Sequence, residues 1–221
     1  MSSPLLCMLA LASMATTASA TVVLPGGYVL VFRATAGITD KVYEAYTNVG
    51  YNDDHRIGMP CGCVSVNGNE SCDRHYRSSL LDAWPSNVRV SWYLGGQEEA
   101  YIEFDGTGST YLNWFSASNV DSSTWTDLGT ETNNFFTIEG HSTSTIDRRF
   151  FINRNYGGCG VDKGWSVVLE ESDACSWGQS LQYPAFLYSS KTTYAEWNTA
   201  ADVGSADVLV IGVKFLSPVD I

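Results

Sequence analysis

Short runs of β-branched and aromatic residues recur along the chain, separated by clusters of Gly, Asn, Asp and Ser. Such runs are typical of β-strands, and such clusters are typical of turns. The clearest case is residues 87–94 (NVRVSWYL), where apolar and polar residues alternate, followed by Gly95-Gly96 and a second alternating run at 99–104 (EAYIEF). Glycine adopts the positive φ angles that a two-residue hairpin needs. These segments predict an antiparallel hairpin.

The rest of the chain follows the same pattern. Residues 28–34 (YVLVFRA) form a continuous apolar run, as expected for a strand buried on both faces. Further strands are predicted at 111–115, 134–139, 148–153, 164–169, 184–188, 194–197 and 207–215. Two short helices are predicted, one through 40–46 with Thr39 as its cap and one through 75–84. We therefore expect an all-β fold, an antiparallel β-sandwich of jelly-roll type with one or two short helices.

The first residues have the pattern of a secretory signal peptide. An apolar run from Leu5 to Met14 is followed by the small residues Ala18-Ser19-Ala20. We expect cleavage after Ala20, which leaves residues 21–221 as one secreted, extracellular β-rich domain. No later segment has the roughly 20 apolar residues that a membrane-spanning helix needs.

The charge balance limits the classes of partner. The chain has 24 acidic and 12 basic residues and a net charge of −12. Nucleic-acid binding needs clustered Lys and Arg, so it is excluded as a function. The acidic surplus is compatible with calcium or a basic partner, although no metal site is predicted. Asp53, Asp54 and Asp105 lie in oxygen-rich turns and are the candidate calcium ligands, with spacing no more specific than that of ordinary turns.

The cysteines of a secreted chain are expected to form disulfides. Once Cys7 leaves with the signal peptide, we expect Cys159 to pair with Cys175 and Cys63 with Cys72. Cys61 is then the remaining thiol, available to link two chains, although Cys61 in place of Cys63 as the partner of Cys72 stays open. A zinc site made of these three cysteines and His75 is the less favoured alternative. Asn69-Glu70-Ser71 is a glycosylation sequon in the same loop.

A glycine-rich stretch at 152–165 (INRNYGGCGVDKGW) contains G-x-G and a lysine. Phosphate-binding loops need a third glycine at a fixed spacing and a helix that follows, whereas here a strand is predicted to begin at Trp165. The stretch is interpreted as a turn held by a disulfide.

Two kinds of residue are candidates for a functional site. Glu103 and Asp105 alternate on one strand and so share a face, as paired catalytic carboxylates of a glycan-active hydrolase would. The chain also has seven tryptophans, and aromatic rings in polar loops are typical of sugar binding. Trp125 and Trp177 lie in such loops and are predicted to be exposed and to bind ligand.

The segments YRSSLLDAW, YIEFDGTGS, NWFS, RRFFIN, NYGGC, GWSVV, CSW and ADVLVIGV, between Phe32 and Phe215, also carry a resemblance. The chain resembles an uncharacterised secreted β-rich domain found in predicted marine-invertebrate proteins. The resemblance implies one extracellular domain with Cys159 paired to Cys175, and it implies no activity. Cys61 departs from the related sequences.

Together these observations favour a non-catalytic recognition or extracellular-matrix module that binds a glycan or an extracellular protein, with no cofactor other than calcium. One alternative is a secreted hydrolase that uses Glu103 and Asp105. A second is a structural or adhesive protein that assembles as a disulfide-linked dimer through Cys61.

Overall fold

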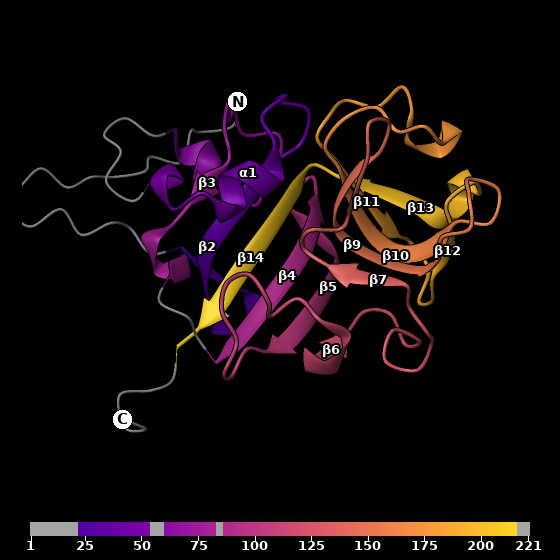
Figure 1. Cartoon of the computed structure of the whole chain (residues 1–221). Helices are drawn as coiled ribbons and strands as arrows, with labels where there is room; N and C mark the ends of the chain where they lie inside the picture. The colour runs from indigo at the N-terminus through magenta and orange to yellow at the C-terminus, as the bar shows by residue number, and fades with distance from the viewer. Residues whose placement is uncertain (1–21, 54–59, 83–85, 216–221) are drawn as a thin grey trace, which may run out of the picture.

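The computed structural model describes residues 22–53, 60–82 and 86–215, and its strands form two antiparallel sheets around a common core (Figure 1). The first sheet has the strand order β1-β2-β14-β4-β5-β6, with β3 paired to β2. The second has the order β13-β11-β10-β9-β7, with β12 paired to β10 and β8 to β9. The all-β sandwich that the sequence predicts is confirmed. The predicted signal peptide, residues 1–20, lies outside the described residues.

The first sheet consists of β1 (Val23–Leu24), β2 (Tyr28–Thr35), β3 (Tyr76–Arg77), β4 (Asn87–Leu94), β5 (Gln97–Asp105), β6 (Val120–Ser123) and β14 (Val208–Lys214). The second consists of β7 (Phe135–Thr137), β8 (His141–Ser142), β9 (Asp147–Asn155), β10 (Lys163–Leu169), β11 (Ala185–Ser189), β12 (Ala195–Glu196) and β13 (Val203–Ala206). One α-helix, α1 (Val42–Thr47), is described, together with the 3-10 helices η1 (Pro25–Gly27), η2 (Val49–Tyr51), η3 (Cys61–Val64), η4 (Ser79–Asp82), η5 (Ala117–Asn119), η6 (Ser176–Gly178) and η7 (Ala200–Asp202).

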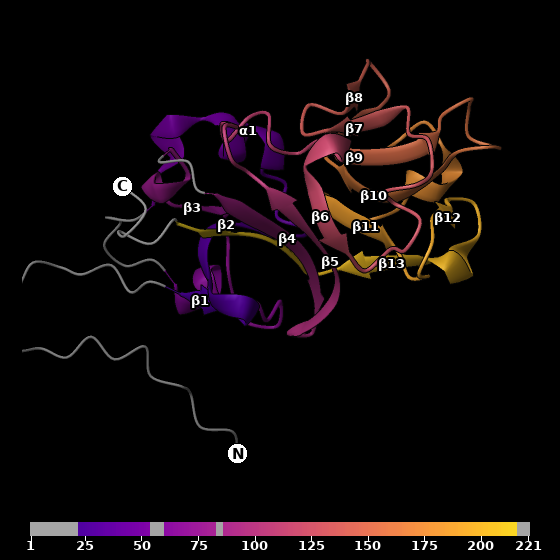
Figure 2. The same cartoon turned by 90° about the horizontal axis from the view of Figure 1, so that it is seen from below.

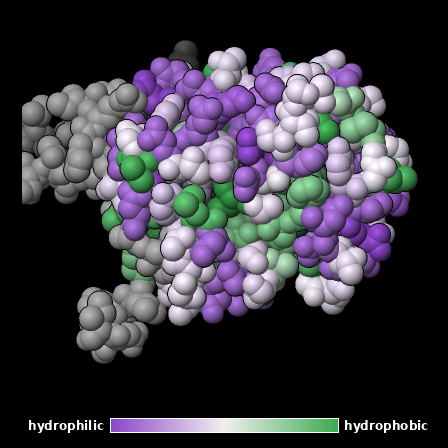
Figure 3. Space-filling model, in the orientation of Figure 1, coloured by the Kyte–Doolittle hydropathy of each residue, from purple (hydrophilic) through white to green (hydrophobic). Residues whose placement is uncertain are grey.

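The predicted hairpin is β4–β5, and Gly95 and Gly96 occupy its turn with φ angles of 58° and 84°. Figure 2 shows the strands of the first sheet curving, with β1 below them. Inward-facing side chains of both sheets form the core, and its largest members are aromatic: Phe32, Tyr46, Trp92, Phe104, Trp114, Trp125, Phe150 and Trp165. Buried aromatic side chains contribute the largest hydrophobic areas of a core. The face seen in Figure 3 mixes hydrophilic and hydrophobic residues.

The chain crosses from the second sheet to the first at Asp207, which lies between β13 and β14. The Asp207 N–H donates to the Tyr93 carbonyl, and the Asp207 carbonyl accepts from the Ala36 N–H. Its side chain accepts a 2.8 Å hydrogen bond from the Gly95 N–H. These bonds attach the corner to β4 and β2, so the position of β13 is fixed relative to the first sheet.

A bulge in β9 decides which side chains reach the outer face of the second sheet. The register with β10 shifts between Ser166 and Val168, opposite Phe150, whose φ is +41°. In a regular strand Arg148 and Phe151 would face opposite sides. Because of the extra residue, Phe151 lies on the same face as Arg148, and the Arg148 guanidinium lies 5.5 Å from the Phe151 ring centroid. Phe151 belongs to the outer apolar cluster of the second sheet, which consists of Phe151, Val167, Leu169, Ala185, Leu187 and Trp197.

Three predictions of local structure are wrong. The described part of the predicted helix 75–84, residues 75–82, forms no α-helix, because Tyr76 and Arg77 pair with β2 as strand β3 and η4 follows. Residues 111–113 form a turn and residues 114–115 have no regular secondary structure, where a strand over 111–115 is predicted. Helix α1 has Lys41, not Thr39, at its N-cap. Its first two N–H groups instead donate to the Glu170 carboxylate at 2.8 and 2.7 Å, a partner distant in sequence.

Candidate functional site

A pocket of about 400 Å³ opens on the outer face of the second sheet, over β11 and β13. Its volume lies at the small end of the range for ligand sites. Strand residues form its floor, and the segments around η6 and η7 form its walls. The lining residues are all uncharged: Ser176, Trp177, Leu181, Leu187, Trp197, Asn198, Ala200, Val203, Gly204 and Ser205.

Two tryptophans stack in the wall of this pocket. The ring centroids of Trp177 and Trp197 lie 5.5 Å apart with an interplanar angle of 25°. Trp177 is half-buried and Trp197 is only 2% exposed. The guanidinium of Arg148 lies 4.5 Å from the centroid of Trp177, a cation–π contact. The aromatic wall is therefore supported from within the protein.

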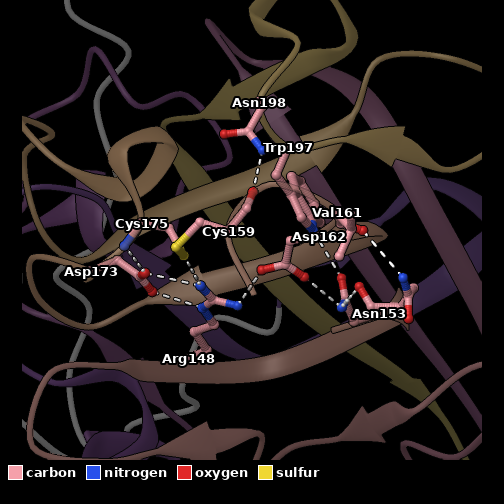
Figure 4. Close-up of polar contacts among 10 residues, drawn as sticks. Arg148, Asn153, Cys159, Val161, Asp162, Asp173, Cys175, Trp197 and Asn198 are labelled. Atoms are coloured by element: carbon pink, nitrogen blue, oxygen red, sulfur yellow. Dashed lines mark hydrogen bonds and ion pairs between the residues drawn. A yellow bond between two sulfur atoms is a disulfide. The ribbon is translucent and has the colours of Figure 1, made fainter. Parts of the chain in front are cut away.

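Arg148 is the centre of a buried ionic network (Figure 4). Its Nε and Nη2 donate to both carboxylate oxygens of Asp173 at 2.7 and 2.9 Å, and its Nη1 donates to Asp162 at 2.7 Å. All three side chains are fully buried. Burial raises the pKa of Asp162, although the charge of Arg148 and a hydrogen bond from Asn153 lower it in part. Removing the charge of Arg148 would leave buried carboxylates without their partner.

The same network holds the second tryptophan. Asn153 donates to the Asp162 carboxylate at 2.8 Å, and its Oδ1 accepts from the indole Nε1 of Trp197 at 2.8 Å. Asp162 therefore links Arg148, which supports Trp177, to Asn153, which orients Trp197 (Figure 4). One cluster of polar contacts fixes both aromatic residues of the pocket.

The Cys159–Cys175 disulfide, which was predicted, lies beside this network. Arg148 donates to the Sγ of Cys175 at 3.3 Å, and the Asn198 amide donates to the Cys159 carbonyl. Ser176, which follows Cys175, lines the pocket with Asn198. The disulfide thus connects the glycine-rich turn to two pocket walls. Of the positions in that turn, Gly158 is the glycine that needs a positive φ, at 102°.

The two predicted binding tryptophans have different environments. Trp177 lies in the pocket wall. The prediction that Trp125 is exposed is wrong: it is 2% exposed, packs 5.5 Å from Trp92, and donates its indole N–H to the Ser189 carbonyl. It belongs to the core, because β11 and the first sheet cover it, and it leaves the set of ligand-binding candidates.

The predicted carboxylate pair does not converge on an open site. Glu103 accepts hydrogen bonds from Tyr28 and Arg89 on one oxygen and from Ser122 on the other. Burial raises its pKa, but these bonds outweigh burial, so the pKa lies below its ordinary value. Asp105 is exposed and accepts from the Thr107 N–H at 2.8 Å, as the first residue of a turn does. Glu103 is held as an ion-pair partner between strands.

The second predicted disulfide, Cys63–Cys72, is present, so these two sulfurs are not available as zinc ligands. Cys61 belongs to neither disulfide and is exposed in η3. His75 is buried; its Nδ1 accepts from the Thr35 N–H, and its Nε2 lies 2.9 Å from the Asp40 carbonyl. Asn69 is exposed in the loop that the disulfide closes.

Of the candidate calcium ligands, Asp53 is buried next to β3 and Asp105 is exposed at the end of β5. Asp54 lies outside the described residues. Among residues 22–53, 60–82 and 86–215, no three His, Cys, Asp or Glu side chains form a group that could hold a metal ion. In the same part of the chain, no helix is long and apolar enough to cross a membrane.

Sequence reasoning missed Trp197, Asn198, Ser205 and the buried ions behind them. Trp197 was assigned to a strand, and Asn198 follows it in a short polar segment typical of many turns. Arg148 comes just before the glycine-rich stretch and Asp162 lies within it, and this proximity in sequence is the one signal that could indicate an ion pair. No protein-family model, curated protein or solved structure matches the chain.

Proposed function

We propose that the protein is a secreted, non-catalytic recognition module that binds a glycan in the pocket of Trp177 and Trp197. The observation that carries the proposal is the lining of this pocket. Aromatic and aliphatic side chains are combined there with uncharged hydrogen-bonding groups, in a volume of about 400 Å³. Sugars present apolar C–H faces beside hydroxyl groups, and this mixed surface complements them.

Three polar groups of the lining remain available to a ligand. The hydroxyls of Ser176 and Ser205 and the Oδ1 of Asn198 make no side-chain hydrogen bond to the described part of the chain, and all three residues are exposed. The aromatic wall behind them is held by buried contacts, so little ordering is needed upon binding. Preorganised groups of this kind lower the entropic cost of association.

The two disulfides and the predicted signal peptide support secretion. Outside the cell, glycans and extracellular proteins are the available partners. Asn69 is exposed and would accept a glycan of its own in that compartment.

The test is an immobilised-glycan array probed with the full chain, produced by secretion, together with Ser205→Trp and Ser142→Trp. Both serines are exposed and lie on strands of the second sheet, but only Ser205 lines the pocket. We expect Ser205→Trp to weaken binding at least tenfold and Ser142→Trp to bind like the wild type, with far-UV circular dichroism and cooperative thermal unfolding showing that both are folded. Absence of binding to every glycan, or equal binding by Ser205→Trp, would overturn the proposal.

A further inference from the structure

The orientation of Asn198 is fixed by chemistry. A carbonyl oxygen only accepts, so the Asn198 amide must present its NH2 group to the Cys159 carbonyl. The Oδ1 of Asn198 is then turned away from that carbonyl, as Figure 4 shows. Since Asn198 is exposed and lines the pocket, this oxygen is a hydrogen-bond acceptor at its rim that can take an N–H or O–H from a ligand.

This acceptor has a defined position relative to the rest of the pocket. Cys159 is bonded to Cys175, which is buried, and Ser176 and Trp177 follow Cys175 directly in the wall around η6. The disulfide therefore connects the segment that accepts the hydrogen bond from Asn198 to the segment that carries Trp177. A fixed acceptor discriminates against ligands without a donor more strongly than a mobile one does, because it cannot turn to another partner.

An apolar surface and a hydroxyl lie side by side on the floor. Leu187 and Ser205 are cross-strand partners in β11 and β13, so their side chains share a face of the sheet. Leu187 belongs to the outer apolar cluster, against which Leu181 and Val203 also pack. A methyl group could therefore contact the aliphatic side chains while a neighbouring carbonyl accepts from the Ser205 hydroxyl.

We infer that this pocket selects N-acetylated sugars through their acetamido group. That group combines an N–H for Asn198 Oδ1, a carbonyl for Ser205 and a methyl for the floor. It is also uncharged, as is every side chain of the lining. A sulfated or carboxylated sugar is disfavoured, because the protein has a net charge of −12 and no cationic side chain lines the pocket to pair with the anion. The inference rests on the proposed function and specifies its ligand.

The test is isothermal titration calorimetry of the secreted full chain with a β1,4-linked N-acetylglucosamine trimer and the β1,4-linked glucose trimer. The two probes share linkage and length and differ in the acetamido group. We expect at least tenfold tighter binding of the N-acetylated trimer. Asn198→Ala should reduce the ratio of the two affinities by about threefold or more, because it removes one hydrogen bond and leaves the carbonyl and methyl contacts of the acetamido group.

The matched control is Asn155→Ala. Asn155 is also exposed and also donates its amide to a carbonyl of the glycine-rich turn, that of Val161, but it does not line the pocket. It should keep the wild-type ratio. Equal affinity for the two trimers, or a ratio that Asn198→Ala leaves unchanged, would overturn the inference. The proposed function would still stand in that case if Ser205→Trp blocks glycan binding. Absence of binding to every glycan would overturn both the inference and the proposed function.

Discussion

The guanidinium of Arg148 lies 4.5 Å from the ring centroid of Trp177, so this buried charge on the outer face of the second sheet also supports the pocket wall. Arg148 stands in β9, before the bulge, and its ion pairs are with carboxylates from two later segments, Asp162 and Asp173. Stability and the shape of the candidate site therefore depend on the same side chain.

Replacing Arg148 should be strongly destabilising. Arg148→Met leaves Asp162 and Asp173 buried without their cation, and we expect a loss of about 3–5 kcal/mol in the free energy of unfolding. Arg154→Met is the control, because Arg154 lies on the same strand and its ion pair with Glu131 is partly exposed. That change should cost below about 1 kcal/mol. Urea unfolding measures both, and similar losses would contradict the assignment.

Gly164 is required by close packing and not by a turn. A Cβ at this position would lie 2.4 Å from the Oδ1 of Asn153, the atom that accepts from Trp197. Gly164→Ala should therefore destabilise the domain by more than about 1 kcal/mol and change the near-UV circular dichroism of the tryptophans. At Gly160 a Cβ would meet nothing within 4 Å. Gly160→Ala should leave both measurements unchanged, and a matching effect would refute the packing argument.

Trp125 should behave as a core residue. Trp125→Ala removes a buried ring that packs on Trp92, so we expect a loss of about 3–5 kcal/mol in stability. Glycan affinity, measured at low temperature where the variant is still folded, should stay at the wild-type value because Trp125 does not line the pocket. A selective loss of affinity with little loss of stability would show that Trp125 contacts ligand.

His75 should make the domain less stable in mild acid. Burial lowers its pKa from 6.5 to about 4, so between these values the unfolded chain binds a proton that the folded protein does not. The contribution of neutral His75 to the free energy of unfolding is complete above pH 6.5. About 3 kcal/mol of it is lost as the pH falls toward 4. The free energy of unfolding against pH should show this slope in the wild type and lack it in His75→Gln.

Glu170 should act with the opposite sign. Burial raises its pKa from 4.5 to about 7, although the N–H groups of Tyr43 and Val42 lower it in part. Here the folded protein binds a proton that the unfolded chain does not. The contribution of protonated Glu170 to the free energy of unfolding is therefore complete below pH 4.5 and is lost as the pH rises through 7. The stability advantage of the wild type over Glu170→Gln should shrink across that range. An advantage that grows with pH would show that the carboxylate is stabilised in its ionised form.

The sequence determined the elements whose pattern is local. Alternation at 87–94 and 99–104 with Gly95-Gly96 between them fixes a hairpin, because side-chain direction in a strand has a period of two residues. It also predicted the pairing of Cys159 with Cys175 and of Cys63 with Cys72, the second with Cys61 in place of Cys63 as an open alternative, because secreted proteins favour disulfides over thiols. The all-β class follows from repeated short strands and turn clusters.

Only the tertiary structure decided which residues meet. Trp125 and Trp177 both lie in polar loops, yet one is covered by β11 and the first sheet and the other is left at a pocket, because burial depends on what packs against a side chain. Residues 75–84 carry a helical pattern, but pairing of Tyr76 with Arg33 in β2 overrides it. The pocket itself is assembled from η6, β11, β13 and η7, which are separate in sequence and become neighbours only when the second sheet forms.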